Sequence, residues 1–263
     1  MKITSFEDLQ QAEMELSFGK QKMTVSVFMI DGLLIDSGPA KMKAKLIPLF
    51  EKWDMTKVIL THHHEDHTGL AYWLQEIKKL PIYIHESGIK DCEKRTKLPF
   101  YRKVFWGERE PFQPIELNDM MTTDNYNWDV IHTPGHAHDH VALYNQEKGW
   151  MFGGDLYIQP TPKSLFAFES VPEIIRSLRE VLTYDFETYI CSHAGIKVKG
   201  RQAIEKKLDY LQSVQQEVQL LYNQGMTSRA IRKKLFPKSH PMHYLSFFEN
   251  SPKHIVNSIL EYN

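Results

Sequence analysis

The sequence is poor in cysteine and close to neutral. Its 263 residues include only Cys92 and Cys191, which lie far apart and form no Cys-x-x-Cys pair. We therefore expect neither a disulfide framework nor a cysteine-ligated zinc site, and the low cysteine content is typical of a reducing cytoplasm. The formal net charge is −1, so no overall field attracts the chain to nucleic acid or to an anionic membrane.

Long apolar runs are also missing. No segment approaches the roughly 18 apolar residues of a membrane-spanning helix. The stretch Met1–Asp8 lacks the apolar centre of a signal peptide. We therefore expect a cytoplasmic protein without a membrane partner. With 42% hydrophobic and 25% charged residues, the chain has the ordinary composition of a globular protein and can bury a sizeable core.

Histidine, by contrast, is concentrated in one stretch, Thr61–Gly69. It holds His62, His63, His64 and His67 together with Glu65 and Asp66. Histidine is the commonest metal-ligating side chain, and aspartate also binds divalent ions. Adjacent imidazoles are costly to bury without partners and favour neither helix nor strand. The stretch therefore indicates a metal site.

The histidine stretch lies between an apolar strand, Lys57–Leu60, and a helix. The apolar residues that predict this helix follow Gly69 at helical spacing: Leu70, Trp73, Leu74, Ile77 and Leu80. Residues His62 and His64 are two positions apart, so in an extended segment they point the same way. Asp66 and His67 come a short turn later, where they can face a second ion.

Three later strands also end in metal-ligating residues. Strands expected at 128–132, 150–152 and 189–191 are followed by His136, Asp155 and His193, each beside glycine, threonine or serine. A single histidine at a strand end carries little information, but four strand ends that each present such a residue indicate one shared site. Further expected elements are strands at 23–30, 33–36, 81–85 and 141–144 and helices at 41–53 and 173–182.

After Gly200 the pattern becomes helical. We expect helices at 201–223, from residue 227 or 228 to 236, and at 251–262. The chain thus divides into residues 1–200, a catalytic domain, and residues 201–263, a C-terminal helical module. Basic residues cluster near 94–103 and at 229–234, and they are interpreted mainly as solvated helix faces. The isolated histidines are expected to be structural: His85, His240, His243 and His254.

Together these motifs resemble the metallo-β-lactamase superfamily. The resemblance covers about residues 20–200 and rests on Thr61-His62-x-His64-x-Asp66-His67, Thr133-Pro134-Gly135-His136, Gly153-Gly154-Asp155 and Ser192-His193-Ala194-Gly195. It implies an α+β fold, a four-layer αββα sandwich with a metal site at one edge, here followed by the helical appendage.

Carried over by residue, the resemblance implies a site for two divalent ions. One ion would take His62, His64 and His136, and the other Asp66, His67 and His193, with Asp155 between them. His63 and Glu65 would point outwards as spacers. His138 and His140 are candidates for positions near the site and are not assigned as ligands; Asp139 and His140 either support the ligands or face the substrate. Asp36, at an early strand end, either is solvated or braces the metal loop.

The implied activity is that of a dinuclear metal-dependent hydrolase, in which a metal-bound hydroxide attacks an ester, thioester or lactone carbonyl. Asp66 would be catalytic, orienting the nucleophile and carrying its proton. Zinc is the expected ion, with iron or manganese as alternatives. Members with β-lactamase activity generally have cysteine where this chain has Asp155, so a β-lactam is not the expected substrate.

Among the other branches of the superfamily, the sequence resembles the glyoxalase II-like, lactonase and small endoribonuclease-like hydrolases. The expected partner is a small-molecule substrate, and a homodimer is possible. Two alternatives stay open. One is metal-dependent hydrolysis of RNA phosphodiesters, which would need the basic segments 94–103 and 229–234 to form one positive surface leading to the metals. The other is a non-enzymatic module in which the metals are structural and the tail binds a partner.

Overall fold

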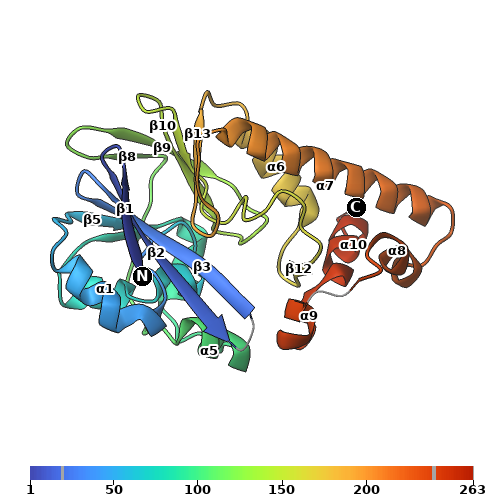
Figure 1. Ribbon diagram of the computed structural model, residues 1–263, viewed down its shortest axis with the longest axis horizontal. Coiled ribbons are helices and arrows are strands. Elements are labelled where there is room, and N and C mark those ends of the chain that lie inside the picture. The colour runs from blue at the N-terminus through green and yellow to red at the C-terminus, as the bar shows by residue number, and fades with distance from the viewer. Residues whose placement is uncertain (19–20, 239–240, 263) are drawn as a thin grey trace.

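Two β-sheets pack face to face in the computed structural model, which describes residues 1–18, 21–238 and 241–262 (Figure 1). The first sheet runs in sequence order from β1 to β7: β1 (Lys2–Phe6), β2 (Leu9–Phe18), β3 (Gln21–Ile30), β4 (Leu33–Ile35), β5 (Lys57–Ile59), β6 (Ile82–Ile84) and β7 (Ile115–Glu116). The second sheet has the order β14-β13-β11-β10-β9-β8: β8 (Met120–Thr122), β9 (Asn127–His132), β10 (Val141–Asn145), β11 (Trp150–Phe152), β13 (Thr188–Cys191) and β14 (Gly195–Lys197). A separate pair joins β12 (Leu165–Phe166) to β15 (Asn250–Ser251).

Helices cover the outer faces of both sheets (Figure 1). Those of the first half are η1 (Ala40–Met42), α1 (Lys43–Phe50), α2 (Glu65–Thr68), α3 (Ala71–Glu76), η2 (Glu86–Gly88), α4 (Ile89–Cys92) and α5 (Phe100–Trp106). Those of the second half are α6 (Val171–Val181), α7 (Gly200–Asn223), α8 (Ser228–Leu235), α9 (Pro241–Leu245) and α10 (Pro252–Leu260). Within the described ranges, none of these helices combines the length and the apolarity needed to cross a bilayer.

Strand alternation explains why the molecule has four layers. In β3, Val25 and Val27 face the helices α1 and α5, whereas Phe28 and Ile30 face the other sheet. Successive side chains of a strand point to opposite faces, so a strand that is apolar at both sets of positions needs cover on both sides. The buried apolar residues accordingly form three clusters, one between the sheets and one under each helical layer. The expected αββα sandwich is confirmed.

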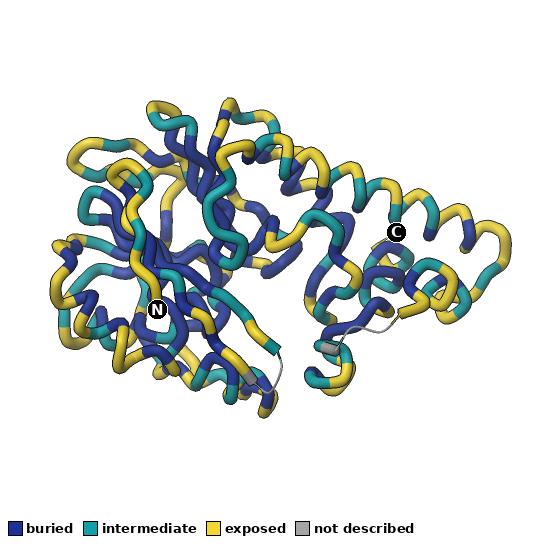
Figure 2. The backbone as a smooth tube through the Cα atoms, in the orientation of Figure 1, coloured by how far each residue is buried: buried dark blue, intermediate teal, exposed yellow. Residues whose placement is uncertain are grey.

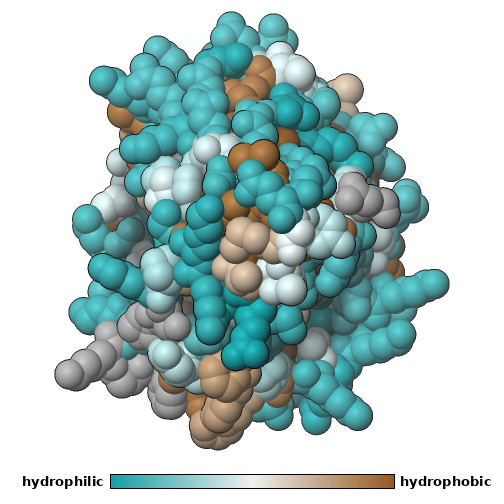
Figure 3. All heavy atoms as spheres, turned by 90° about the vertical axis from the view of Figure 1, so that its right-hand side faces the viewer, coloured by the Kyte–Doolittle hydropathy of each residue, from teal (hydrophilic) through white to brown (hydrophobic). Residues whose placement is uncertain are grey.

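The C-terminal helices continue the outer layer of the second sheet. Helix α7 packs on α6, and α10 contacts both α6 and α7. Figure 2 shows buried positions recurring along the long helix α7, whose remaining positions are intermediate or exposed. The side of the molecule seen in Figure 3 is mostly hydrophilic with small apolar patches. The tail thus buries one face and leaves the other to water.

Several expected elements differ in detail. The N-terminal hairpin of β1 and β2 was not predicted, because its polar residues hide the alternation of Ala12, Met14 and Leu16. The helix expected from Leu70 to Leu80 ends at Glu76, so Ile77 is 65% exposed rather than inward. The Nδ1–H of His243 donates to the Asn250 carbonyl within the tail, and this histidine lies apart from the metal-ligand groups, as expected. His240 lies outside the described residues.

The boundary at residue 200 stays a prediction, and truncation tests it. One apolar cluster joins Leu178 of α6 to Leu211 of α7, so we expect a chain ending at residue 200 to lose its cooperative thermal transition in circular dichroism. Within the full chain, Leu211→Ala should lower the free energy of unfolding by about 2–5 kcal/mol. The exposed Leu220→Ala is the matched control and should change it little. A truncated chain that melts like the full protein would contradict the expectation.

Candidate metal centre

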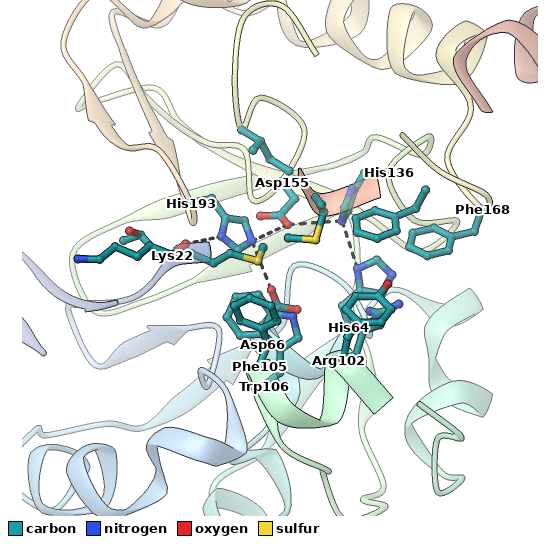
Figure 4. Close-up of a pocket in the computed structure, with 16 residues that line it drawn as sticks. Lys22, His64, Asp66, Arg102, Phe105, Trp106, His136, Asp155, Phe168 and His193 are labelled. Carbon is teal, nitrogen blue, oxygen red and sulfur yellow. Dashed lines mark hydrogen bonds and ion pairs between the residues drawn. The ribbon is translucent and has the colours of Figure 1, made fainter. Parts of the chain in front are cut away.

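Strand direction brings the predicted residues to one edge of the sandwich. β4 is parallel to β5, and β11 is parallel to β13. β9 and β11 are both antiparallel to β10, so they also run the same way. The carboxyl ends of these strands therefore open on the same side, where α/β folds place their sites. Figure 4 shows the labelled histidines and aspartates converging there.

Three histidines form the first group. The Nε2 atom of His62 lies 2.9 Å from Nδ1 of His64, and Nε2 of His136 lies 3.1 Å from the same atom. Burial is the main cause that lowers the pKa of His62 well below its usual value, and repulsion from the neighbouring histidine rings lowers it further. Burial is also the main cause that lowers the pKa of His64 well below its usual value, and the positive charge of Arg102 is the next largest. These two rings are therefore neutral, the form in which imidazole binds a metal.

The second group is mixed. Asp66, His67, Asp155 and His193 place one ligand atom each within 4.8 Å of one another. The Nε2 atom of His193 lies 3.3 Å from Oδ2 of Asp66 and 3.0 Å from Oδ2 of Asp155. Burial lowers the pKa of His193, but the carboxylates of Asp155 and Asp66 together outweigh burial, and the pKa is raised well above its usual value.

One oxygen of Asp155 lies between the two groups. Its Oδ2 is 3.4 Å from Nε2 of His67 and 3.4 Å from Nε2 of His136. Among the described residues, Oδ1 of Asp155 and Nε2 of His67 are buried without a hydrogen-bond partner. Buried polar atoms normally have partners, so unpaired ones inside a cluster of ligand atoms fit bound cations. The donor set, imidazole nitrogen with carboxylate oxygen, suits zinc, iron or manganese.

Asp36 braces this arrangement. Its carboxylate accepts from the Thr61 backbone N–H at 2.8 Å and lies 2.7 Å from Nδ1 of His67. Ser192 donates to it at 3.3 Å from the second sheet. Asp36 is fully buried and has φ +61°, a left-handed conformation that such contacts must stabilise. Of the two interpretations offered by the sequence, the structure supports the bracing role.

The remaining histidines have separate tasks. His140 has both ring nitrogens engaged, Nδ1 with the Thr133 hydroxyl at 2.8 Å and Nε2 accepting from the Asp155 backbone N–H at 3.0 Å. It therefore supports the Asp155 turn. A side chain at Gly154 would lie 2.6 Å from Nε2 of His140, so the turn requires glycine there. His138 lies 3.2 Å from an oxygen of Asp91 at the surface.

The two supposed spacers are not free. Glu65 is buried and forms a two-pronged ion pair with Arg102, at 2.6 and 2.7 Å, so its expected outward position is wrong. Glu65 is the first residue of helix α2. The alternation of side chains in an extended strand, on which the expected outward position was based, therefore does not apply to it. His63 is half-buried and lies 2.7 Å from Asp139.

Two further supporting residues were not predicted. Glu169 lies 2.7 Å from Nδ1 of His136 and orients that ring. Lys207, on α7, is fully buried and donates to the carbonyls of Leu156 and Tyr157 at 2.6 and 2.7 Å. Neither residue lies in a motif, and a buried lysine in an amphipathic helix looks like any other polar position in the sequence.

Comparisons with known proteins agree with this fold. The family profile described as Metallo-beta-lactamase superfamily matches residues 23–193. The chain is 26% identical over 261 residues to a probable metallo-hydrolase of Bacillus subtilis, with 81% of each chain covered. It is 26% identical over 152 residues to a hydroxyacylglutathione hydrolase of Bdellovibrio bacteriovorus, with 56% of this chain and 52% of that protein covered.

Solved structures show the same fold. The crystal structure of a metallo-beta-lactamase family protein from Thermus thermophilus superposes with a TM-score of 0.72 at 19% identity, covering 98% of this chain and 93% of that one. A metallo-beta-lactamase from Pontibacter korlensis gives a TM-score of 0.66 at 16% identity, covering 80% of this chain and 98% of that one. The first of these likenesses extends through the C-terminal helices.

Lys207 gives the stability a pH dependence. Burial lowers its pKa from 10.5 to about 8, so between these values the unfolded chain binds more protons than the folded chain. The cost of holding the ammonium group buried is present below pH 8 and disappears as the pH rises towards 10.5. From pH 7.5 to 10, wild type should therefore gain about 2–3 kcal/mol of unfolding free energy relative to Lys207→Met.

Urea denaturation of metal-free protein measures this difference, since metal affinity then contributes no pH dependence of its own. Lys206→Met, at an exposed position of the same helix, is the matched control and should follow wild type. An equal pH dependence in wild type and Lys207→Met would contradict the prediction.

Proposed function

We propose that this chain, a metal-dependent hydrolase of the metallo-β-lactamase superfamily to which it belongs, cleaves an ester, thioester or lactone at a carbonyl carbon. The observation that carries the proposal is the pair of ligand groups on either side of Asp155 Oδ2. We assign one divalent ion to His62, His64 and His136. We assign a second to Asp66, His67 and His193, with Asp155 facing both.

Bound ions would lower the pKa of a coordinated water towards neutrality and stabilise negative charge on the carbonyl oxygen. The chain's own residues do the rest. Asp66 orients the water and takes up its proton. The water oxygen bonds to the carbonyl carbon, the bond from that carbon to sulfur or oxygen breaks, and the proton ends on the leaving thiol or alcohol. Asp36 and Glu169 keep His67 and His136 in one orientation.

Zinc is the ion we propose, because five of the seven assigned ligands are histidines. Iron and manganese remain alternatives for the mixed group. A thioester is the favoured substrate class among carbonyl compounds, since several of the similar proteins are named hydroxyacylglutathione hydrolase. Asp155, where β-lactamases of the superfamily generally carry cysteine, argues against a β-lactam.

Phosphodiester hydrolysis has less support. Helix α8, with its basic residues, packs on α7 and α10 and lies far from α5 in Figure 1. Near the site, Arg102 pairs with Glu65 and Arg95 with Glu110. The two basic segments therefore form no single positive surface leading to the metal-ligand edge, which binding of an RNA backbone would require.

Removal of metal tests the proposal directly. We expect a chelator to abolish thioester hydrolysis and added Zn²⁺, Mn²⁺ or Fe²⁺ to restore it, because Asp66 alone is too weak a base to deprotonate a water that no ion has acidified. His62→Ala and Asp155→Ala should lower kcat/KM at least about a hundredfold with the circular dichroism spectrum unchanged. His254→Ala, in the tail, is the control and should behave like wild type. Undiminished hydrolysis by metal-free protein would exclude the mechanism.

Asp36→Asn tests the bracing role separately. Asparagine keeps the size of the side chain and tolerates φ +61°, but it removes the charge that faces His67. We expect metal affinity, measured by competition with a chromophoric chelator, to fall about 10–100-fold. Asp54→Asn, at an exposed position remote from the site, should leave affinity unchanged. Wild-type affinity in Asp36→Asn would show that Asp36 has only a structural role.

A further inference from the structure

An apolar cavity of about 270 Å³ opens beside the metal-ligand residues. Its floor is formed by His64, Asp66, His136, Asp155 and His193. Most of its wall is apolar: Met23, Phe105, Trp106, Ile158, Phe166 and Phe168. Figure 4 shows Phe168 on one side of the floor and Phe105 with Trp106 on another. Cavities of this kind bind small molecules by apolar contact, with polar groups only where the chemistry takes place.

Two charged side chains and one hydroxyl group of the cavity wall already have partners within the protein. Arg102 uses two nitrogens on Glu65, and its guanidinium lies 5.6 Å from the Phe168 ring centroid. Lys22, at the rim, pairs with Glu15 at 2.9 Å. The Tyr101 hydroxyl donates to Glu249 at 2.7 Å. A charged substrate group in this part of the cavity would lose water without gaining a free counter-charge.

Two wall residues expose apolar surface that a ligand would cover. Phe168 is 44% exposed and stacks on Phe166, with ring centroids 5.3 Å apart and planes at 1°. Ile158 is 36% exposed. Both contribute to the cavity, yet neither is packed as a core side chain. Covering such surface is worth roughly 25 cal/mol per Å².

Ile158 is also held in a strained conformation. It has φ +48°, which is rare for a β-branched residue, and it is the central residue of a tight turn closed by a 2.5 Å hydrogen bond from Gln159 N–H to the Tyr157 carbonyl. The same carbonyl accepts from Lys207. Strain of this kind persists where the surroundings impose it, and it is concentrated at ligand sites. Here the buried lysine of α7 supports a turn that presents an isoleucine to the cavity.

We propose that this cavity binds the acyl group of the substrate, that the acyl group is apolar and uncharged, and that Ile158 and Phe168 determine this specificity. The inference rests on the proposed hydrolysis of a thioester or ester. The acyl part suits the cavity because its carbon chain stays neutral throughout the reaction. The new carboxylate stays at the metal-ligand floor, and the leaving thiol, which develops charge, faces solvent.

The test uses metal-loaded protein and N-acetylcysteamine thioesters with acetyl, butanoyl and hexanoyl groups, which differ only in the acyl chain. Each added methylene should raise kcat/KM about three- to fourfold until the cavity is filled. A second series keeps the acetyl group and lengthens the thiol instead, and it should show no such rise. A rise confined to the thiol series would overturn the assignment to the acyl group.

Ile158→Gly supplies the specificity test. Glycine adopts positive φ without strain, so this variant should keep or increase its melting temperature. We expect the ratio of kcat/KM for hexanoyl to that for acetyl thioester to fall about tenfold, and a smaller fall in the same direction for Phe168→Ala. Ile77→Gly, which removes an exposed isoleucine at the end of α3, is the matched control and should keep the wild-type ratio.

The outcomes separate the two proposals. If wild type hydrolyses every thioester at the same rate, or if Ile158→Gly slows both thioesters equally, the specificity inference is wrong while the hydrolase proposal stands. If metal-loaded wild type hydrolyses none of them, the proposed thioester hydrolysis is wrong, and the specificity inference that rests on it is wrong as well.

Discussion

The buried carboxylate of Asp36 is the interaction on which the site depends most. It accepts hydrogen bonds at the end of β5 and from the end of β13, and so joins the two sheets at the edge where the ligand groups lie. It also faces Nδ1 of His67, which leaves the other ring nitrogen directed at Asp155. A buried carboxylate needs several donors, and here those donors belong to the residues that must be held in place.

The C-terminal helices also support the site. Lys207 reaches from α7 to the turn after Asp155, and the carbonyl of Tyr157 that it binds is also the one that closes the strained turn at Ile158. One helix therefore supports both the strand end that carries the candidate ligand Asp155 and the part of the cavity wall formed by Ile158. This link explains why a helical tail accompanies a sandwich whose ligand residues all precede residue 194.

The candidate ligand residues could be proposed from the sequence because strand ends are local features. The apolar strands before His62, His136, Asp155 and His193 are short, and glycine, threonine or serine marks the end of each. Their order also carries the family resemblance. The supporting residues could not be found in this way. Glu169 is 33 positions from His136, and Arg102 is 37 positions from Glu65. Lys207 is 51 and 50 positions from Leu156 and Tyr157, whose carbonyls it binds.

Strand ends and ligand chemistry, which are local properties of the chain, were enough to predict the shared edge and the seven candidate ligands, and the four-layer sandwich followed from the family resemblance that those motifs carry. Contacts between distant segments were needed to show that Asp36 braces the site, that Glu65 is buried against Arg102, and that the cavity beside the candidate metal-ligand residues has mostly apolar walls with paired charges. These features depend on which side chains meet across sheets and helices. Burial and pairing of charges are properties of those contacts, and no single segment of the chain contains them.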